Sequence, residues 1–156
     1  MKGKSVSGNA ISGIRYAFNT IGKHISKSQK IDDSLLEELT ELASVIFTDL
    51  QKIDVVKARE FDLFMSSLKK TITGANSAIC WRKNTREDLN YHIMNKGVSK
   101  ADLEKKFSEF MLCDIETTKV TSKLQIMCTE GSKMAYSYRW ISVTGIVAPL
   151  GIIKAS

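Results

Sequence analysis

Hydrophobic residues recur every three or four positions along most of the chain, the pattern of helices with one buried face. The first such stripe comprises Ile11, Ile14, Phe18, Ile21 and Ile25. At 100° per residue, Lys23, Lys27 and Lys30 project on the opposite side. The pattern predicts an amphipathic N-terminal helix. Its glycines cost about 1 kcal/mol each relative to alanine, so the helix needs a surface on which to form.

A second apolar series runs through residues 31–73, which contain no glycine or proline. Ser34 and Glu37 have the spacing of a capping box, so we predict that a helix begins there. Gly74 is a typical helix end. Because helices of globular domains usually run about 8–20 residues, we favour two helices with a break at 53–56 over one long helix.

Two further helices are predicted beyond this point. One spans 77–95 and ends before Gly97, and the next begins at Ser99 and closes at Gly131. The threonine-rich part of the latter, 117–122, is also compatible with a strand, since period alone does not exclude one.

The pattern changes towards the C-terminus. Residues 141–153 carry no charge and follow Tyr136, Tyr138 and Trp140. Thirteen helical residues span about 20 Å, less than the ~30 Å hydrocarbon core, so a conventional transmembrane helix is not expected. The segment fits either a dip into a membrane surface with the aromatic rings at headgroup level, or a buried terminal helix docked on the bundle.

The chain of 156 residues has the length of one domain. We predict an all-α fold, an antiparallel bundle of five or six helices that forms a single domain over 1–156. Within this domain, 1–30 form the basic amphipathic segment, 31–131 the helical core, and 132–156 the aromatic and apolar end.

The net charge of +6 is equivalent to that of residues 1–30, which hold six bases and no acid. Residues 31–62 hold nine acids and three bases. The first helix therefore has two alternatives. It packs beside its acidic neighbour, which neutralises it, or it presents its lysines to an anionic membrane, where each adds on the order of 1 kcal/mol.

These patterns predict a non-enzymatic helical protein that acts through membrane-surface association or helix-mediated protein–protein interaction. Membrane-active bacterial factors and viral structural or accessory proteins are among the classes that fit. The expected partner is an anionic membrane surface or another protein, and an oligomer is compatible with the same surfaces. The candidate contact residues are Ile14, Arg15, Phe18, Ile21, Lys23, Lys27, Trp140, Ile141 and Ile146.

A nucleic-acid-binding helical module is the alternative. Its candidate face consists of Trp81, Arg82, Lys83 and Arg86, a basic cluster beside an aromatic ring. Such cations contact phosphates while the ring stacks on a base. The same residues are also compatible with an ordinary solvated helix face whose tryptophan packs into the core.

Catalytic and metal chemistry have little support in the sequence. Cys80, Cys113, Cys128, His24 and His92 include no pair at zinc-binding spacing, and we expect the thiols to be buried in helix packing. A nucleophile pair of Cys80 and His92 stays open, because such pairs form in space. No phosphate-binding loop or hydrolase motif occurs, so no enzyme, cofactor or metal site is predicted.

The cysteines and the N-terminal residues indicate in which cellular compartment the protein is expected. Three cysteines fit no disulfide framework, and the N-terminus lacks the apolar core of a secretory signal. We therefore expect a cytoplasmic protein that can associate peripherally with a membrane.

Overall fold

The computed structural model describes residues 5–95, 97–142 and 145–146. Its elements are α1 (Gly8–Ser26), α2 (Asp33–Gln51), α3 (Val55–Met94), α4 (Lys100–Ser137), a 3-10 helix η1 (Tyr138–Trp140), and the two-residue strands β1 (Ile141–Ser142) and β2 (Gly145–Ile146), which pair antiparallel. The fold is all-α apart from this strand pair.

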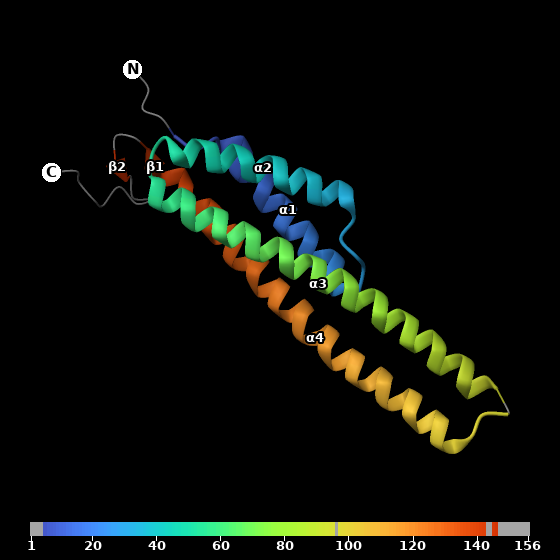
Figure 1. Ribbon diagram of the computed structural model, residues 1–156. Helices are drawn as coiled ribbons and strands as arrows, with labels where there is room; N and C mark the ends of the chain where they lie inside the picture. The colour runs from blue at the N-terminus through green and yellow to red at the C-terminus, as the bar shows by residue number, and fades with distance from the viewer. Residues whose placement is uncertain (1–4, 96, 143–144, 147–156) are drawn as a thin grey trace.

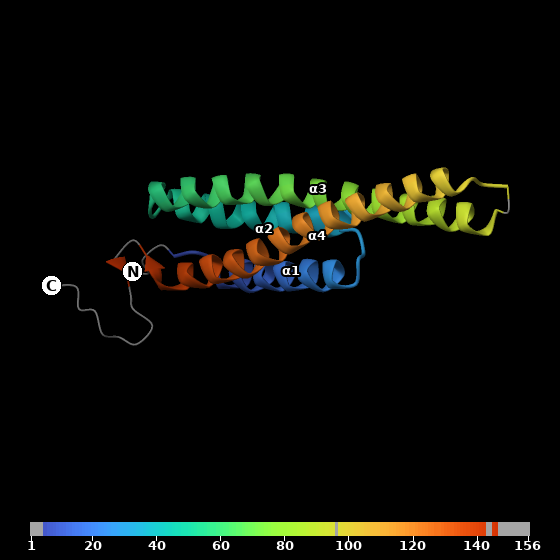
Figure 2. The same cartoon turned by 90° about the horizontal axis from the view of Figure 1, so that it is seen from below.

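The four α-helices run alternately up and down (Figure 1). α1 packs against α2 and α4, and α3 packs against the same two helices, so the four form a closed ring. α2 and α3 make one layer of the bundle, and α1 with the C-terminal half of α4 makes the other (Figure 2). The predicted antiparallel helical bundle is therefore observed.

α3 and α4 are about twice as long as α1 and α2, with 40 and 38 residues against 19 and 19. Their connected ends extend past α1 and α2 as a two-helix hairpin (Figures 1 and 2). We call residues 83–116 the distal hairpin. It begins just beyond Arg82, whose guanidinium donates to Ser28 Oγ in the α1–α2 connection at 2.8 Å.

Side-chain caps fix where the helices begin. Asp54 Oδ1 accepts from the backbone N–H groups of Val56 and Lys57, which starts α3 and confirms the predicted break at 53–56. α2 begins two residues earlier than expected, because the N-cap is Asp32, whose side chain accepts from Leu35 N at 2.8 Å, and not Ser34.

Two predicted helix ends are wrong, and they explain why five or six helices are not observed. α3 continues through Gly74, and α4 continues through Gly131. Both glycines lie in long helices whose neighbouring positions, such as Ala75 and Cys128, are buried in the interior. Packing along an uninterrupted seam outweighs the local helix cost of glycine, about 1 kcal/mol.

The threonine-rich part of α4 is helical, so the strand alternative is wrong. Thr117 is fully buried, and its hydroxyl lies 2.8 Å from the carbonyl oxygen of Cys113 one turn earlier and 3.1 Å from that of Ala78 on α3. These carbonyls satisfy a hydroxyl that would otherwise be costly to bury. The side chain therefore joins the two long helices.

The core closes around the apolar stripe of α1. Ile11, Ile14, Phe18, Ile21 and Ile25 are all buried. The Phe18 ring meets the Phe64 ring edge-to-face, with centroids 6.4 Å apart. Both rings lie against Gly131, where an added Cβ would stand 2.9 Å from each. α4 can approach α1 and α3 this closely because position 131 has no side chain.

We expect Gly131→Ala to lower the free energy of unfolding by about 1–3 kcal/mol, because the new methyl group must displace two buried rings. This loss outweighs the gain in helix propensity from alanine, about 1 kcal/mol. Urea denaturation followed by circular dichroism measures the change.

Gly74→Ala is the matched control. Its added Cβ would lie 3.7 Å from Val120, an ordinary contact, so we expect a gain of about 0.5–1 kcal/mol. Equal stability of the two variants would show that the Phe18 and Phe64 rings do not confine position 131.

Candidate functional site: a basic helical layer

The structure divides the predicted contact residues of α1 into two groups. Ile14, Phe18 and Ile21 are at most 1% exposed and belong to the core, so they cannot meet a partner while the bundle is closed. Arg15 and Lys23 are exposed, as is Lys27 at the end of the helix. The cations of α1, and not its apolar stripe, are available to a partner.

α1 packs beside α2 as the intramolecular alternative requires, but its cations are not paired there. Among the described residues, no ion pair joins α1 to α2. Asp49 of α2 instead accepts from Ser7 N at 2.9 Å, at the N-terminus of α1. A carboxylate at this place stabilises the positive end of the helix dipole and leaves the lysines of α1 free.

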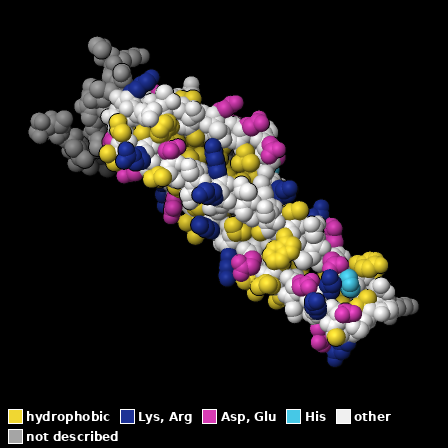
Figure 3. Space-filling model, viewed as in Figure 1, with side chains coloured by type: hydrophobic (Ala, Val, Ile, Leu, Met, Phe, Trp, Pro, Cys, Tyr) yellow, Lys and Arg dark blue, Asp and Glu magenta, His cyan; other side chains and the backbone are white. Residues whose placement is uncertain are grey.

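The charges separate between the two layers of the bundle. Residues 5–27 and 121–142, which form the α1–α4 layer, hold six Lys and Arg and one acid. Residues 31–76, which form the α2–α3 layer, hold nine acids and five bases. Figure 3 views the α2–α3 side, where acidic side chains follow α2. The molecule therefore has one strongly basic side.

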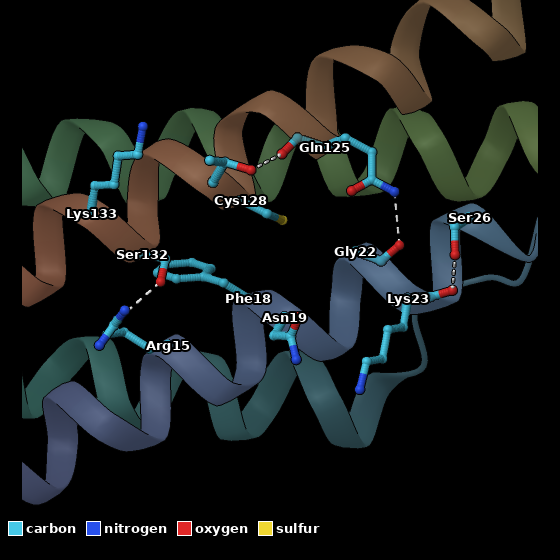
Figure 4. Close-up of a pocket in the computed structure, with 11 residues that line it drawn as sticks. Arg15, Phe18, Asn19, Gly22, Lys23, Ser26, Gln125, Cys128, Ser132 and Lys133 are labelled. Carbon is cyan, nitrogen blue, oxygen red and sulfur yellow. Dashed lines mark hydrogen bonds between the residues drawn. The ribbon is translucent and has the colours of Figure 1, made fainter.

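A groove of about 540 Å³ lies in the basic layer, between α1 and α4. Its charged lining residues are Arg15, Lys23 and Lys133, and no acid lines it. Lys23 and Lys133 extend from opposite rims and point away from one another (Figure 4). Because the ammonium groups do not converge, this arrangement suits an extended anionic surface better than a small enclosed anion.

Two hydrogen bonds hold the groove together. Arg15 Nε donates to Ser132 Oγ at 3.1 Å, and Gln125 Nε2 donates to the carbonyl oxygen of Gly22 at 2.8 Å (Figure 4). Both connect α1 to α4. The orientation of the basic side chains thus depends on the packed bundle and not on α1 alone.

An aromatic and arginine cluster borders the same layer at the end of α4. The Arg15 guanidinium carbon lies 4.7 Å from the Tyr136 ring centroid, and that of Arg139 lies 5.4 Å from it. Trp140 meets Tyr136 edge-to-face, with centroids 6.2 Å apart. The Trp140 indole N–H is buried and has no acceptor among the described residues. Cations stacked on exposed rings are a common feature of interfacial surfaces.

The C-terminal candidates have different positions. Ile141 is buried in the core, together with Tyr138, whose ring meets Phe61 edge-to-face. Burial raises the pKa of the Tyr138 hydroxyl, and the nearby negative charge of Glu60 raises it further. Ile146 lies in β2, but its side chain and residues 147–153 fall outside the described part of the chain. A membrane contact by this run stays a prediction.

The predicted nucleic-acid face is not assembled as one surface. Arg82 is 13% exposed, and its guanidinium bonds to Asp114 at 3.3 Å as well as to the α1–α2 connection. The Arg86 guanidinium covers the ring of Phe110 at 5.8 Å. Trp81, which is 47% exposed, lies about 140° around α3 from Arg86.

The cysteines do not form a reactive site. Cys80 and His92 lie on one helix, twelve residues and therefore about 18 Å apart, so they make no nucleophile pair. Cys113 and Cys128 are buried as expected, but Cys80 is exposed, which corrects the expectation for that thiol. Within the described residues, no three His, Cys, Asp or Glu side chains come together as metal ligands.

Sequence reasoning missed the contribution of α4 to the basic layer. Lys123 and Lys133 of α4 lie more than 100 residues beyond the centre of α1 in the sequence, and Lys133 borders the α1–α4 groove only through the fold. Their local pattern gave no signal, because single lysines on a helix are ordinary surface residues. The basic layer could have been predicted only if the packing of α1 against α4 had been known.

Searches against protein families, curated proteins and solved structures find no match to this chain. In the described part of the chain, no helix combines the length and the apolar character needed to cross a membrane.

Thiol labelling tests this description of the cysteines. Burial raises the pKa of the Cys128 thiol to about 12, so the reactive thiolate is scarce at neutral pH. We expect iodoacetamide at pH 8 to label Cys80 rapidly and Cys113 and Cys128 only after denaturation, as read by peptide mass spectrometry.

Cys80→Ser is the control and should abolish the rapid labelling. Rapid modification of Cys128 in the folded protein would contradict its burial beneath the α1–α4 groove.

Proposed function

We propose that this protein is non-enzymatic and acts by placing its α1–α4 layer on an anionic membrane surface. The observation that carries the proposal is the separation of charge across the bundle, with six cations and one acid on the α1–α4 side. Each lysine or arginine near an anionic leaflet contributes on the order of 1 kcal/mol.

The contact that we propose is electrostatic and peripheral. The apolar stripe of α1 is occupied inside the bundle, so insertion of that helix into lipid would require the core to open. Arg15, Lys23 and Lys133 can meet headgroups without any rearrangement, because they lie along the open α1–α4 groove. Tyr136 and Arg139 extend the same side towards the end of α4. Binding should therefore weaken as salt screens the charges.

Vesicle sedimentation tests the proposal. The full chain should sediment with vesicles of phosphatidylcholine and phosphatidylserine at low salt, and should stay in solution with phosphatidylcholine alone. The triple variant Lys23→Gln, Lys27→Gln, Lys133→Gln should bind about a hundredfold more weakly, because it loses roughly 3 kcal/mol of attraction.

The matched control removes the same net charge from the opposite layer, as Lys52→Gln, Arg59→Gln, Lys70→Gln. These three cations are exposed on the α2–α3 side, so their loss should weaken binding severalfold at most. Equal losses in the two triple variants would contradict a contact through the α1–α4 layer, and so would equal binding to neutral vesicles.

Binding to nucleic acid can be compared with binding to vesicles for the same protein. A duplex or single strand that binds more tightly than the vesicles, with an affinity that falls by about 0.7–0.9 log units per phosphate contacted for each log unit of salt, would favour the nucleic-acid-binding alternative over the membrane.

A further inference from the structure

A second surface lies at the far end of the molecule, where the distal hairpin has no covering layer. Leu89 and Ile93 of α3 and Leu103 and Phe107 of α4 line a mainly apolar groove of about 470 Å³ there, and Glu104 and Ser108 complete its lining. Ile93 is 58% exposed and Phe107 is 54% exposed. Half-exposed side chains of this size gathered around one groove differ from the scattered apolar residues of an ordinary surface.

The heptad spacing of α3 and α4 shows on which face of the distal hairpin the groove lies. Residues seven positions apart share a face in a pair of packed helices. Ile93 therefore shares a face with Met65, which lies 28 residues earlier, and Phe107 shares a face with Cys128, 21 residues later. Met65 is 4% exposed and lines the contact of α3 with α2, and Cys128 is 5% exposed and lines the contact of α4 with α1.

The groove is thus the continuation of the face that α1 and α2 cover in the bundle. The covering layer stops at the α1–α2 connection, where Asn76 of α3 bonds to both the N–H and the carbonyl of Ile31 at 2.7 and 2.9 Å. Beyond that point the same heptad positions of α3 and α4 lose their cover. Nearest the bundle they carry Arg86 and Asp114, and they become apolar again at Ile93 and Phe107. The uncovered space accommodates two more antiparallel helices.

We propose that a second copy of this chain fills that space, so that two distal hairpins pack face to face and form an intermolecular four-helix bundle. A two-fold axis across the hairpins makes each apolar face its own complement. The hairpins then run antiparallel, and each four-helix body lies beyond the tip of the partner hairpin. This orientation keeps the two α1–α2 pairs apart.

Charge favours a second copy over the anionic partner of the basic layer. Residues 83–116 hold six bases and seven acids, so two copies approach without strong repulsion and an anionic surface is not attracted. The area is sufficient for a weak dimer. Helices of about 20 Å in a face about 20 Å wide bury on the order of 1,000 Å² in total, near the lower limit for specific interfaces.

Sedimentation equilibrium of the full chain tests the proposal over concentrations from about 1 µM to about 500 µM, the range in which a small interface associates. We expect a monomer–dimer equilibrium. Phe107→Glu and Ile93→Glu should each raise the dimer dissociation constant at least about tenfold, because each places two carboxylates in the apolar interface. Circular dichroism and thermal unfolding confirm that both variants remain folded.

Leu112→Glu is the matched control. Leu112 is 57% exposed and lies about 140° around α4 from Phe107, so its replacement should leave the dissociation constant unchanged. The proposal is overturned by a monomer at every concentration, by dimers that tolerate both Phe107→Glu and Ile93→Glu, or by equal weakening with Leu112→Glu. The triple lysine variant of the basic layer should dimerise normally, which separates this inference from the proposed membrane contact.

Discussion

The packing of α1 into the seam between α3 and α4 is the constraint on which the rest of the structure depends. Phe18 occupies the space beside Gly131, against Phe64, and this three-helix contact fixes how closely α4 approaches α1. Helices of this length are marginal alone, and α1 carries glycines that weaken it further. Burial of its stripe therefore forms the helix and closes the core in one step.

The placement of charge follows from that packing. With the isoleucines of α1 turned inward, Arg15 and Lys23 must face the α4 side or solvent, while α2 carries its acids on the other layer. If the acids of α2 neutralised the cations of α1 through ion pairs, the lysines of α1 would have to lie along the α1–α2 contact. The described ion pairs all lie instead on α3 and α4. A basic side and an acidic side are the result.

The sequence predicted the all-α class, the stripe of α1, the break before α3 and the start of α4 at Ser99, because these follow from local periodicity and caps. It failed at Gly74 and Gly131, where a local rule for helix ends competes with packing along a continuous seam. It also missed the basic layer, because Lys133 and Arg15 meet only through tertiary contacts. A helix cap is set by residues that are close in the sequence, whereas the residues that share a surface are set by the tertiary fold.

Because α3 and α4 are longer than α1 and α2, the distal hairpin is stabilised by other interactions than the four-helix bundle. A two-helix seam cannot exclude water from both flanks, so polar contacts supplement its narrow core. Lys106 bonds to Asp88 at 2.8 Å, which lowers the pKa of that carboxyl and raises the pKa of the lysine. Such exposed pairs contribute little stability, because water and salt screen them. The flanking Ile93 and Phe107 contribute little while they are half-exposed, so covering them would add buried apolar area to the hairpin.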